Sequence, residues 1–373
     1  MHDVLIIGGG VIGLSLAWDL AQHGRSVRVI DRGQPGREAS WAGAGILPPA
    51  NLLRPALHPY DHLCGLSSRL HDEWAPRLQS LTGIDTGYRR CGGIYLARTA
   101  GEAAALAAWA AEQQSLGIAV ERLERADLTR IEPGLRLSVE KSPVFRGPCF
   151  LLPDEAQLRN PRHVRALVAA GEKLGVTIAP NVTAIDATIE AGQIAAITTD
   201  AGPLRARQVC FTAGAWTGQL LVRLGIAAGI LPIRGQMVMF RCARKAIAHI
   251  LNEGSRYIVP RDDGRVLAGA TEEEVGFDKR TTEQAITELT AWARLLVPAL
   301  AAAPVEQSWA GLRPGSFDGF PYLGPLPGLA NAFVAAGHFR SGIYLSPATA
   351  VVMSQLMRGE PPEVDLAPFR VGR

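Results

Sequence analysis

The stretch VLIIGGGVIGLSLAWDLAQHGRSVRVID, residues 4–31, decides the fold that this sequence predicts. A short apolar run, typical of a buried parallel strand, leads into Gly8, Gly10 and Gly13 in the spacing G-x-G-x-x-G. A helical segment follows, and a second apolar strand then ends on Asp31. This order of strand, glycine turn, helix, strand and acid predicts a dinucleotide-binding βαβ unit of the Rossmann type.

Each residue of this unit has a physical role. Gly8 permits a tight turn, Gly10 lets a pyrophosphate approach the backbone, and Gly13 lets the helix pack closely on the strand. The amino end of the helix attracts phosphate charge, and Asp31 can accept hydrogen bonds from a ribose. The first thirty-one residues therefore predict a dinucleotide site.

Two further segments favour FAD over a nicotinamide cofactor. Residues 36–49, GREASWAGAGILPP, are rich in small side chains that let backbone lie against a large planar ligand. Residues 207–218, RQVCFTAGAWTG, predict a strand that ends in a small-residue turn, as in the second cofactor contact of flavoproteins. No His, Lys or Tyr stands out in the setting of a nicotinamide-linked dehydrogenase. The small residues concerned are Ala39, Ser40, Ala44, Gly45, Thr212, Ala213 and Gly214.

The composition bounds the class of protein. The 373 residues are 47% apolar and 20% charged with a formal net charge of +3, which fits a globular chain of two domains and does not argue for nucleic acid. Five scattered cysteines without metal-ligand spacing predict no metal site and a reducing, cytoplasmic location. The amino-terminal run lacks the basic segment and cleavage site of a signal peptide, and no uncharged apolar stretch reaches about 18 residues, so no membrane association is expected.

The rest of the chain predicts a mixed architecture. Helices are expected over 102–116 and after Pro161, alternating strands between 230 and 270, and a helix that begins with a capping box of Thr281 and Gln284. The fold class is therefore α/β with α+β: a discontinuous Rossmann-like FAD-binding domain with an inserted, mostly antiparallel substrate-binding domain. The expected boundaries are 1–50, 151–220 and 310–373 for the first domain, and 51–150 and 221–309 for the second.

Seven segments together resemble one family. They are VLIIGGGVIG, EASWAGAGIL, GGIYLA, TAGAWTG, RYIVPRDDGRVLAGAT, WAGLRPGSFDGFPYLG and AAGHFRSGIYLSPATA. With these segments in this order, the chain resembles the D-amino acid oxidase family of flavoproteins over nearly its whole length, and most closely the glycine oxidase branch.

The resemblance implies a set of cofactor and substrate residues. Tyr257 closes over the carboxylate of a small amino acid, which Arg313 and Arg340 bind. Val182 makes a backbone contact to the adenine by analogy, and the run from His338 to Tyr344 surrounds the flavin ring. The implied FAD contacts, joined with those from the glycine motifs, are Gly8, Gly10, Val11, Ile12, Gly13, Asp31, Arg32, Ala39, Ser40, Ala44, Gly45, Ile46, Val182, Thr212, Gly214, His338, Phe339, Arg340, Ser341, Gly342, Ile343 and Tyr344.

Arg313 and Arg340 both lie in apolar, glycine-rich stretches, where an unpaired guanidinium is costly to bury. A planar guanidinium pairs bidentately with a carboxylate, so two of them would fix the orientation of an amino acid. The alternative for each is a structural ion pair with an acid such as Asp318. Tyr257 is open between a substrate contact and ordinary packing, and His338 is expected to be a hydrogen-bonded neighbour of the ring, not an acid–base catalyst.

The resemblance implies oxidative deamination of glycine or another small amine. The imine would hydrolyse to glyoxylate and ammonia, or feed thiazole formation for thiamine, and oxygen would reoxidise FAD to give peroxide. Because no cysteine follows Cys242, FAD is expected to be non-covalent. The alternatives are oxidation of small D-amino acids or sarcosine, a nicotinamide-linked dehydrogenase, and a non-catalytic flavin-binding protein. Ile46 and the residues around Met237 would decide between substrates. Family members are often homo-oligomers, but the sequence identifies no interface.

Overall fold

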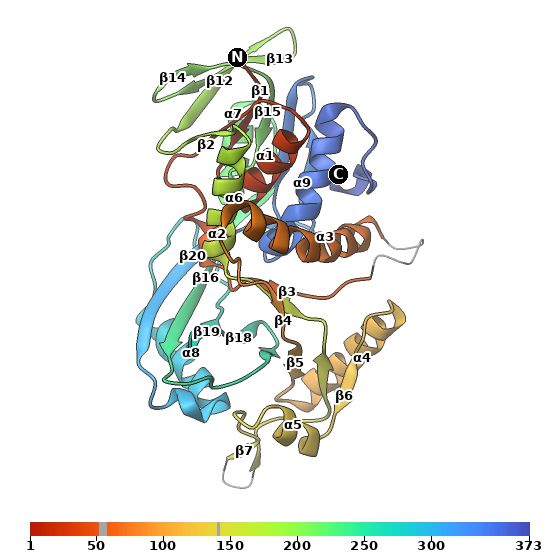
Figure 1. The fold of residues 1–373 in the computed structure, drawn as a ribbon, viewed down its shortest axis with the longest axis vertical. Helices are drawn as coiled ribbons and strands as arrows, with labels where there is room; N and C mark the ends of the chain where they lie inside the picture. Colours follow the sequence, from red (N-terminus) through yellow and green to blue (C-terminus); the bar gives the residue numbers. More distant parts are fainter. Residues whose placement is uncertain (52–57, 140–141) are drawn as a thin grey trace.

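The structure is a computed structural model that describes residues 1–51, 58–139 and 142–373. A six-stranded sheet forms the centre of the upper half in Figure 1. Its strands are parallel except for β21 at one edge. In spatial order they are β11 (Thr177–Ala179), β2 (Val27–Ile30), β1 (His2–Ile7), β15 (Ala206–Phe211), β22 (Ala332–Ala336) and β21 (Tyr322–Pro325).

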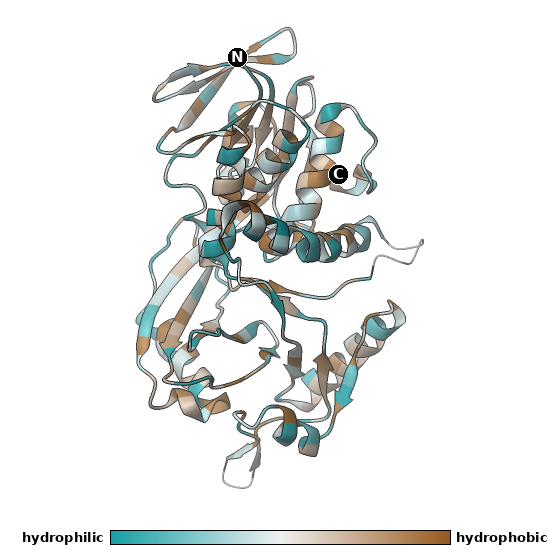
Figure 2. Ribbon diagram, in the orientation of Figure 1, coloured by the Kyte–Doolittle hydropathy of each residue, from teal (hydrophilic) through white to brown (hydrophobic). Residues whose placement is uncertain are grey.

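Four helices share one core with this sheet. They are α1 (Val11–Gln22), α3 (Pro59–Thr82), α6 (Asn160–Lys173) and α9 (Gly342–Arg358). Apolar side chains of α3 recur every three or four residues, which gives the alternation of brown and teal along this helix in Figure 2. A second core lies under β12 (Ala184–Glu190), β13 (Gln193–Thr199) and α7 (Thr217–Arg223). The Rossmann-like sheet predicted from the first thirty-one residues is confirmed.

An eight-stranded sheet forms the lower half in Figure 1. It is antiparallel except where β17 pairs with β5. In spatial order the strands are β20 (Val305–Ser316), β16 (Ile230–Arg241), β19 (Arg265–Gly269), β18 (Arg256–Pro260), β17 (Ile250–Glu253), β5 (Gly93–Leu96), β9 (Cys149–Leu152) and β6 (Glu121–Leu123). Helix α8 (Glu283–Leu296) packs on this sheet, and its side chains join those of the strands in a separate core.

Short elements complete the described chain. The helices are α2 (Ala39–Ala42), α4 (Ala100–Ser115), α5 (Arg125–Ile131) and the 3₁₀ turns 214–216, 298–300 and 367–369. The strands are β3 (Ile46–Leu47), β4 (Arg89–Arg90), β7 (Ser138–Val139), β8 (Ser142–Pro143), β10 (Ala156–Gln157) and β14 (Gly202–Leu204).

The sequence misplaces one helix cap. We expected Thr281 and Gln284 to begin the helix, but Thr282 is the N-cap, and its Oγ1 accepts a hydrogen bond from the backbone N–H of Ala285. Gln236 of β16 stabilises Thr282 in this position. Its Oε1 accepts the backbone N–H of Thr282, and its Nε2 donates to the Oγ1 of the same residue. A contact between distant segments therefore fixes the cap.

The domain boundaries remain a prediction. Two elements lie across them in the structure. Helix α3, within the expected substrate-binding segment 51–150, packs in the core of the Rossmann-like sheet. Strand β20, which straddles residue 310, pairs with β16 along its length in the antiparallel sheet. Helix α3 and strand β20 therefore bear on where the chain passes from one half to the other, and the boundaries stay a prediction.

Candidate cofactor and substrate site

A cavity of about 580 Å³ lies where the two halves meet. Residues of β1, β2, α2, β20 and the start of α9 line it, together with one face of the antiparallel sheet. Every cofactor and substrate residue predicted from the sequence is among the lining residues except Gly13. The structure thus brings stretches that lie far apart in the sequence, from Gly8 to Tyr344, to one cavity.

The glycine turn after β1 requires glycine for two reasons. Gly8 has a φ of 115°, and a Cβ there would lie 2.5 Å from the carbonyl oxygen of Thr212. A Cβ at Gly13 would lie 2.1 Å from the carbonyl oxygen of Gly8, so this residue allows α1 to pack against the turn without touching the cavity. The hydroxyl of Thr212 donates to the Gly8 carbonyl at 2.7 Å and joins β15 to the turn.

Asp31 and Ser40 fasten the same turn with their side chains. The Asp31 carboxylate accepts the backbone N–H of Gly9 at 2.8 Å and that of Gly33 at 2.9 Å, and Ser40 Oγ accepts the N–H of Val11 at 2.9 Å. Burial raises the pKa of Asp31, while the two backbone hydrogen bonds oppose that shift. A carboxylate offers about four acceptor sites, so Asp31 retains capacity for ribose hydroxyls.

The cavity residues fit a flavin dinucleotide. Helix α1 begins at Gly10, which has no side chain to cap it, so apart from the Val11 N–H that Ser40 accepts, its positive end can face a pyrophosphate. The N–H of Val182 bonds the carbonyl oxygen of Asp31 at 2.8 Å, which holds this apolar residue beside Asp31. Arg32 lies 3.6 Å from the centre of the Trp216 ring and pairs with Glu38. Small residues at 39–45 leave the wall of the cavity as backbone.

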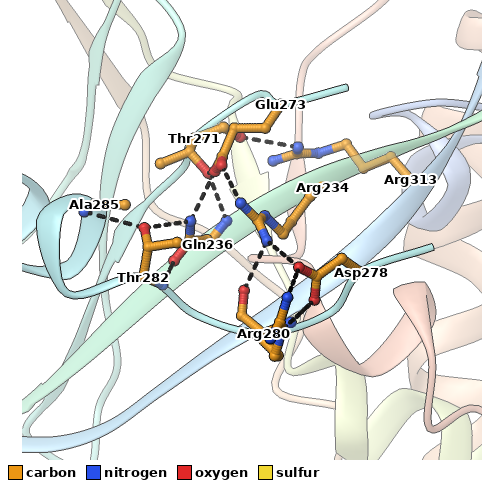
Figure 3. A network of polar contacts seen from close by, with 9 residues as sticks. All are labelled: Arg234, Gln236, Thr271, Glu273, Asp278, Arg280, Thr282, Ala285 and Arg313. Atoms are coloured by element: carbon orange, nitrogen blue, oxygen red, sulfur yellow. Dashed lines mark hydrogen bonds and ion pairs between the residues drawn. The ribbon is translucent and has the colours of Figure 1, made fainter. Parts of the chain in front are cut away.

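Arg313 lies on β20 against the backbone of the neighbouring strand. A Cβ at Gly235 would lie 2.3 Å from its guanidinium, so this glycine of β16 makes the room in which the guanidinium lies. Its Nη1 donates to the carbonyl oxygen of Thr271 at 3.1 Å, as Figure 3 shows. Asp318 pairs instead with Arg373. Among the described residues Arg313 has no acidic partner in an ion pair.

Arg340 differs from its expected surroundings. Its side chain is 38% exposed and pairs with the carboxylate of Glu272. The expectation of a buried guanidinium is therefore wrong for this residue, because the turn that carries it lies at the mouth of the cavity and not in the core. The N–H of Phe339 bonds the carbonyl oxygen of Pro314 at 2.8 Å, which brings this turn beside Arg313.

His338 and the start of α9 form the opposite wall. His338 is buried, its Nε2 lies 3.0 Å from the hydroxyl of Thr349, and burial lowers its pKa to about 3. The imidazole is therefore neutral near pH 7. Helix α9 begins at Gly342 without a side-chain cap, so its positive end is open toward the cavity.

Tyr257 belongs to a row of residues that runs across the antiparallel sheet. Tyr95, Asn252, Tyr257, Gly269 and Met237 are register partners on β5, β17, β18, β19 and β16. Register partners share one face of a sheet. The Tyr257 hydroxyl lies 3.4 Å from the sulfur of Met237, and all but the glycine line the cavity. Tyr95 and Asn252 were not predicted, because strand pairing and not sequence spacing aligns them.

Other chemistry is limited in the described part of the chain. None of the five cysteines lines the cavity. Across residues 1–51, 58–139 and 142–373, no cluster of three His, Cys, Asp or Glu side chains could hold a metal ion. No helix within these ranges combines the length and apolar character needed to cross a membrane.

The fold and the cavity define the class of protein: a dinucleotide-dependent oxidoreductase in which an antiparallel sheet closes the cofactor site. The family model for DAO, FAD dependent oxidoreductase, matches residues 3–356. The chain is 37% identical to glycine oxidase of Pseudomonas putida over 98% of its length and 97% of that protein. It is 32% identical to the bifunctional protein ThiO/ThiG of Trichormus variabilis, covering all of this chain and 55% of that one.

A solved structure agrees with these relatives. Glycine oxidase from Geobacillus kaustophilus superposes with a TM-score of 0.93 at 32% identity, over all of this chain and 98% of the other. The chain therefore belongs to the DAO family of FAD-dependent oxidoreductases. Its cofactor is FAD, and it is an FAD-dependent amino acid oxidoreductase.

Proposed function

We propose that the chain oxidises glycine, or a similarly small α-amino acid, and passes the electrons to oxygen. The observation that carries the proposal is the Arg313 guanidinium, held over Gly235 in the same cavity as the glycine turn. The similarity to the Pseudomonas putida glycine oxidase over almost the whole chain supports the choice of substrate. The imine product would hydrolyse to glyoxylate and ammonia, and oxygen would become hydrogen peroxide.

In this proposal residues along the cavity would hold the cofactor. Backbone of the turn around Gly10 and the start of α1 hold the pyrophosphate, Asp31 accepts hydrogen bonds from the ribose, and Val182 contacts the adenine. The turn 338–344 lies against the flavin ring. The attachment is non-covalent, because a thioether link needs a cysteine at the ring and the cavity-lining residues include none.

The substrate carboxylate lies between the two arginines. Arg313 presents its fork from β20, Arg340 presents its own from the turn before α9, and Tyr257 lies on the sheet face between them and Asn252. Two guanidinium groups on one carboxylate fix both its position and its plane. The Cα–H bond of the amino acid is thereby held in one orientation, which supplies much of the rate in reactions of this kind.

The residues of the chain need only bind the amino acid and orient its Cα–H bond. FAD, when bound, supplies the hydride acceptor for the Cα–H bond of the amino acid. The neutral His338 stays out of proton transfer, because its pKa of about 3 leaves it a poor base. The open positive end of α9 stabilises negative charge that develops beside it. The substrate enters the reaction as the neutral amine.

We also propose a cytoplasmic location and a supply of imine to thiazole formation in thiamine biosynthesis. The scattered cysteines support the first. The similarity to the bifunctional ThiO/ThiG protein supports the second.

An anaerobic titration of the purified FAD-loaded protein tests the proposed function. Glycine, sarcosine and D-alanine are added in parallel while the flavin absorbance is followed. We expect glycine to bleach the absorbance, and admitted air to restore it with formation of peroxide. Bleaching by sarcosine or D-alanine but not by glycine would overturn the choice of substrate. Bleaching that air does not reverse would overturn the choice of oxygen as acceptor.

A further inference from the structure

A buried carboxyl group lies directly behind the cavity wall. Glu155 has no exposed surface, and the carboxylate is held by two side chains that line the cavity. The hydroxyl of Tyr95 donates to its Oε2 at 2.6 Å, and the amide Nδ2 of Asn252 donates to its Oε1 at 3.0 Å. No cationic side chain of the described residues pairs with it, and a buried acid in this state is costly, which points to a role in the site.

The fold makes dedicated room for this carboxyl group. A Cβ at Gly93 would lie 2.4 Å from the Glu155 carboxyl, so the carboxyl lies flat against the backbone of β5. Gly93 stands two residues before Tyr95 on the same strand, and therefore on the same face of the sheet. The ring of Trp109 packs 4.5 Å from that of Tyr95 and fixes its position. The glycine, tyrosine and tryptophan together hold the acid in one place.

The carboxyl group dictates what its two neighbours present to the cavity. Asn252 turns its NH₂ group toward Glu155, as an ionised carboxylate that only accepts hydrogen bonds requires, and its carbonyl oxygen turns away. Tyr95 likewise gives its only proton to Glu155, so its oxygen is left as an acceptor. This end of the cavity therefore offers acceptors and negative charge, which suit an amino group.

Positive charge lines the same cavity. Arg313 and Arg340 provide it, and Tyr257, which is proposed to lie over the carboxylate, is the register partner of Asn252 on the neighbouring strand. An α-amino acid carries its carboxylate and its amino group on adjacent atoms, with the same polarity. Burial raises the pKa of Glu155 to about 7, while the hydrogen bonds from Tyr95 and Asn252 favour the ionised form.

We propose that Glu155 is a positioning residue that, through Tyr95 and Asn252, makes this end of the cavity the binding site for the substrate's amino group. The inference rests on the proposed function, because it assumes that an α-amino acid occupies the cavity. Its ligand class is a primary or small secondary amine that carries a carboxylate.

The test compares a ligand that has an amino group with one that lacks it. The FAD-loaded protein and its Glu155→Gln variant are compared in KM for glycine and in the inhibition constant of acetate, which has only the carboxylate. The variant keeps the shape of the side chain and removes its charge. We expect KM for glycine to rise about 10-fold, as for the loss of one charge-assisted contact, while the acetate constant changes less than about 2-fold.

Glu132→Gln is the matched control. Glu132 is also a buried acid in the half of the molecule built on the antiparallel sheet. Its carboxylate accepts hydrogen bonds from two backbone N–H groups and contacts the His249 imidazole, and the residue does not line the cavity. We expect it to leave both constants unchanged. Equal shifts of the glycine and acetate constants in Glu155→Gln, or no shift in either, would overturn the inference.

Two alternative experiments cover the cases in which the first comparison cannot be made. If Glu155→Gln does not retain FAD, the same comparison is made with Asn252→Ala, which removes the amide and leaves the buried acid. If glycine does not reduce the wild-type flavin, the proposed substrate fails, and the comparison is repeated with whichever amino acid does reduce it. Failure of the inference is then seen against a working substrate and is distinct from failure of the proposed function.

Discussion

At the scale of single residues, the position of the Arg313 guanidinium depends on a glycine, Gly235, on the neighbouring strand. Its guanidinium lies where a Cβ of Gly235 would be, and Thr271 holds one nitrogen through its carbonyl oxygen. Among the described residues no other partner takes up the remaining donors of Arg313, which can bind a carboxylate in the plane that this contact sets. An ordinary surface arginine would have to be ordered first, at a cost in side-chain entropy.

Arg313→Leu should therefore weaken substrate binding and spare the cofactor. We expect KM for the amino acid to rise by a factor that corresponds to about 2–5 kcal/mol, since a desolvated charge-assisted contact is lost. The flavin content should stay that of the wild type. Steady-state kinetics and the ratio of flavin to protein absorbance measure the two effects. Arg265→Leu, at the half-buried start of β19, is the control, and an unchanged KM in Arg313→Leu would remove Arg313 from the substrate site.

At the scale of elements, the segment between β19 and α8 reaches both arginines. Thr271 contacts Arg313, and the next residue, Glu272, pairs with Arg340. Figure 3 shows how the segment is fastened: Arg234, buried in β16, binds Glu273 and Asp278, and Gln236 binds Glu273. Glu272 stands between Thr271 and Glu273 of this network, so its position is fixed as well. Its carboxylate pairs with the Arg340 guanidinium, which is proposed to bind the substrate.

Glu272→Gln should therefore lower KM for the amino acid. The carboxylate of Glu272 competes with that of the substrate for Arg340, and an exposed ion pair is worth about 0.2–1 kcal/mol, which sets the decrease at up to about 5-fold. Glu274→Gln, an exposed residue of the same segment, controls for the change in net charge. If KM in Glu272→Gln equals that of Glu274→Gln or rises, the competition does not exist.

Elements formed by neighbours in sequence were predictable, and those that depend on distant partners were not. The unit from β1 to Asp31 follows from its own residues, since turn, helix and strand each carry a local signal. The cap of α8 depends on Gln236, and the partner of Arg340 lies 68 residues away, so neither has a local signal. The same reason hid Tyr95 and Asn252, which strand register alone brings to the cavity.

At the scale of the whole molecule, Arg261 ties the two halves together beside the cofactor cavity. It follows β18, is buried, and bonds the side chain of Gln157 at 2.7 Å and the carbonyl oxygens of Leu158 at 2.9 Å and Ala44 at 2.7 Å. Burial lowers its pKa to about 9, so it stays charged near pH 7. One side chain thus joins the antiparallel sheet to the backbone at Ala44, which lines the cavity.

Arg261→Met should both speed the release of FAD and lower the free energy of unfolding. Methionine keeps the apolar stem but leaves the buried carbonyl oxygens of Leu158 and Ala44 without this donor, at a cost of about 2–4 kcal/mol in the free energy of unfolding. We expect faster release of FAD, because Ala44 loses its anchor to the sheet. Arg265→Met removes an arginine from the same turn whose ion pairs are exposed, and should change stability by less than about 1 kcal/mol. Urea unfolding and the rate of flavin release measure both effects. Equal behaviour of the two variants would show that the halves are held together without Arg261.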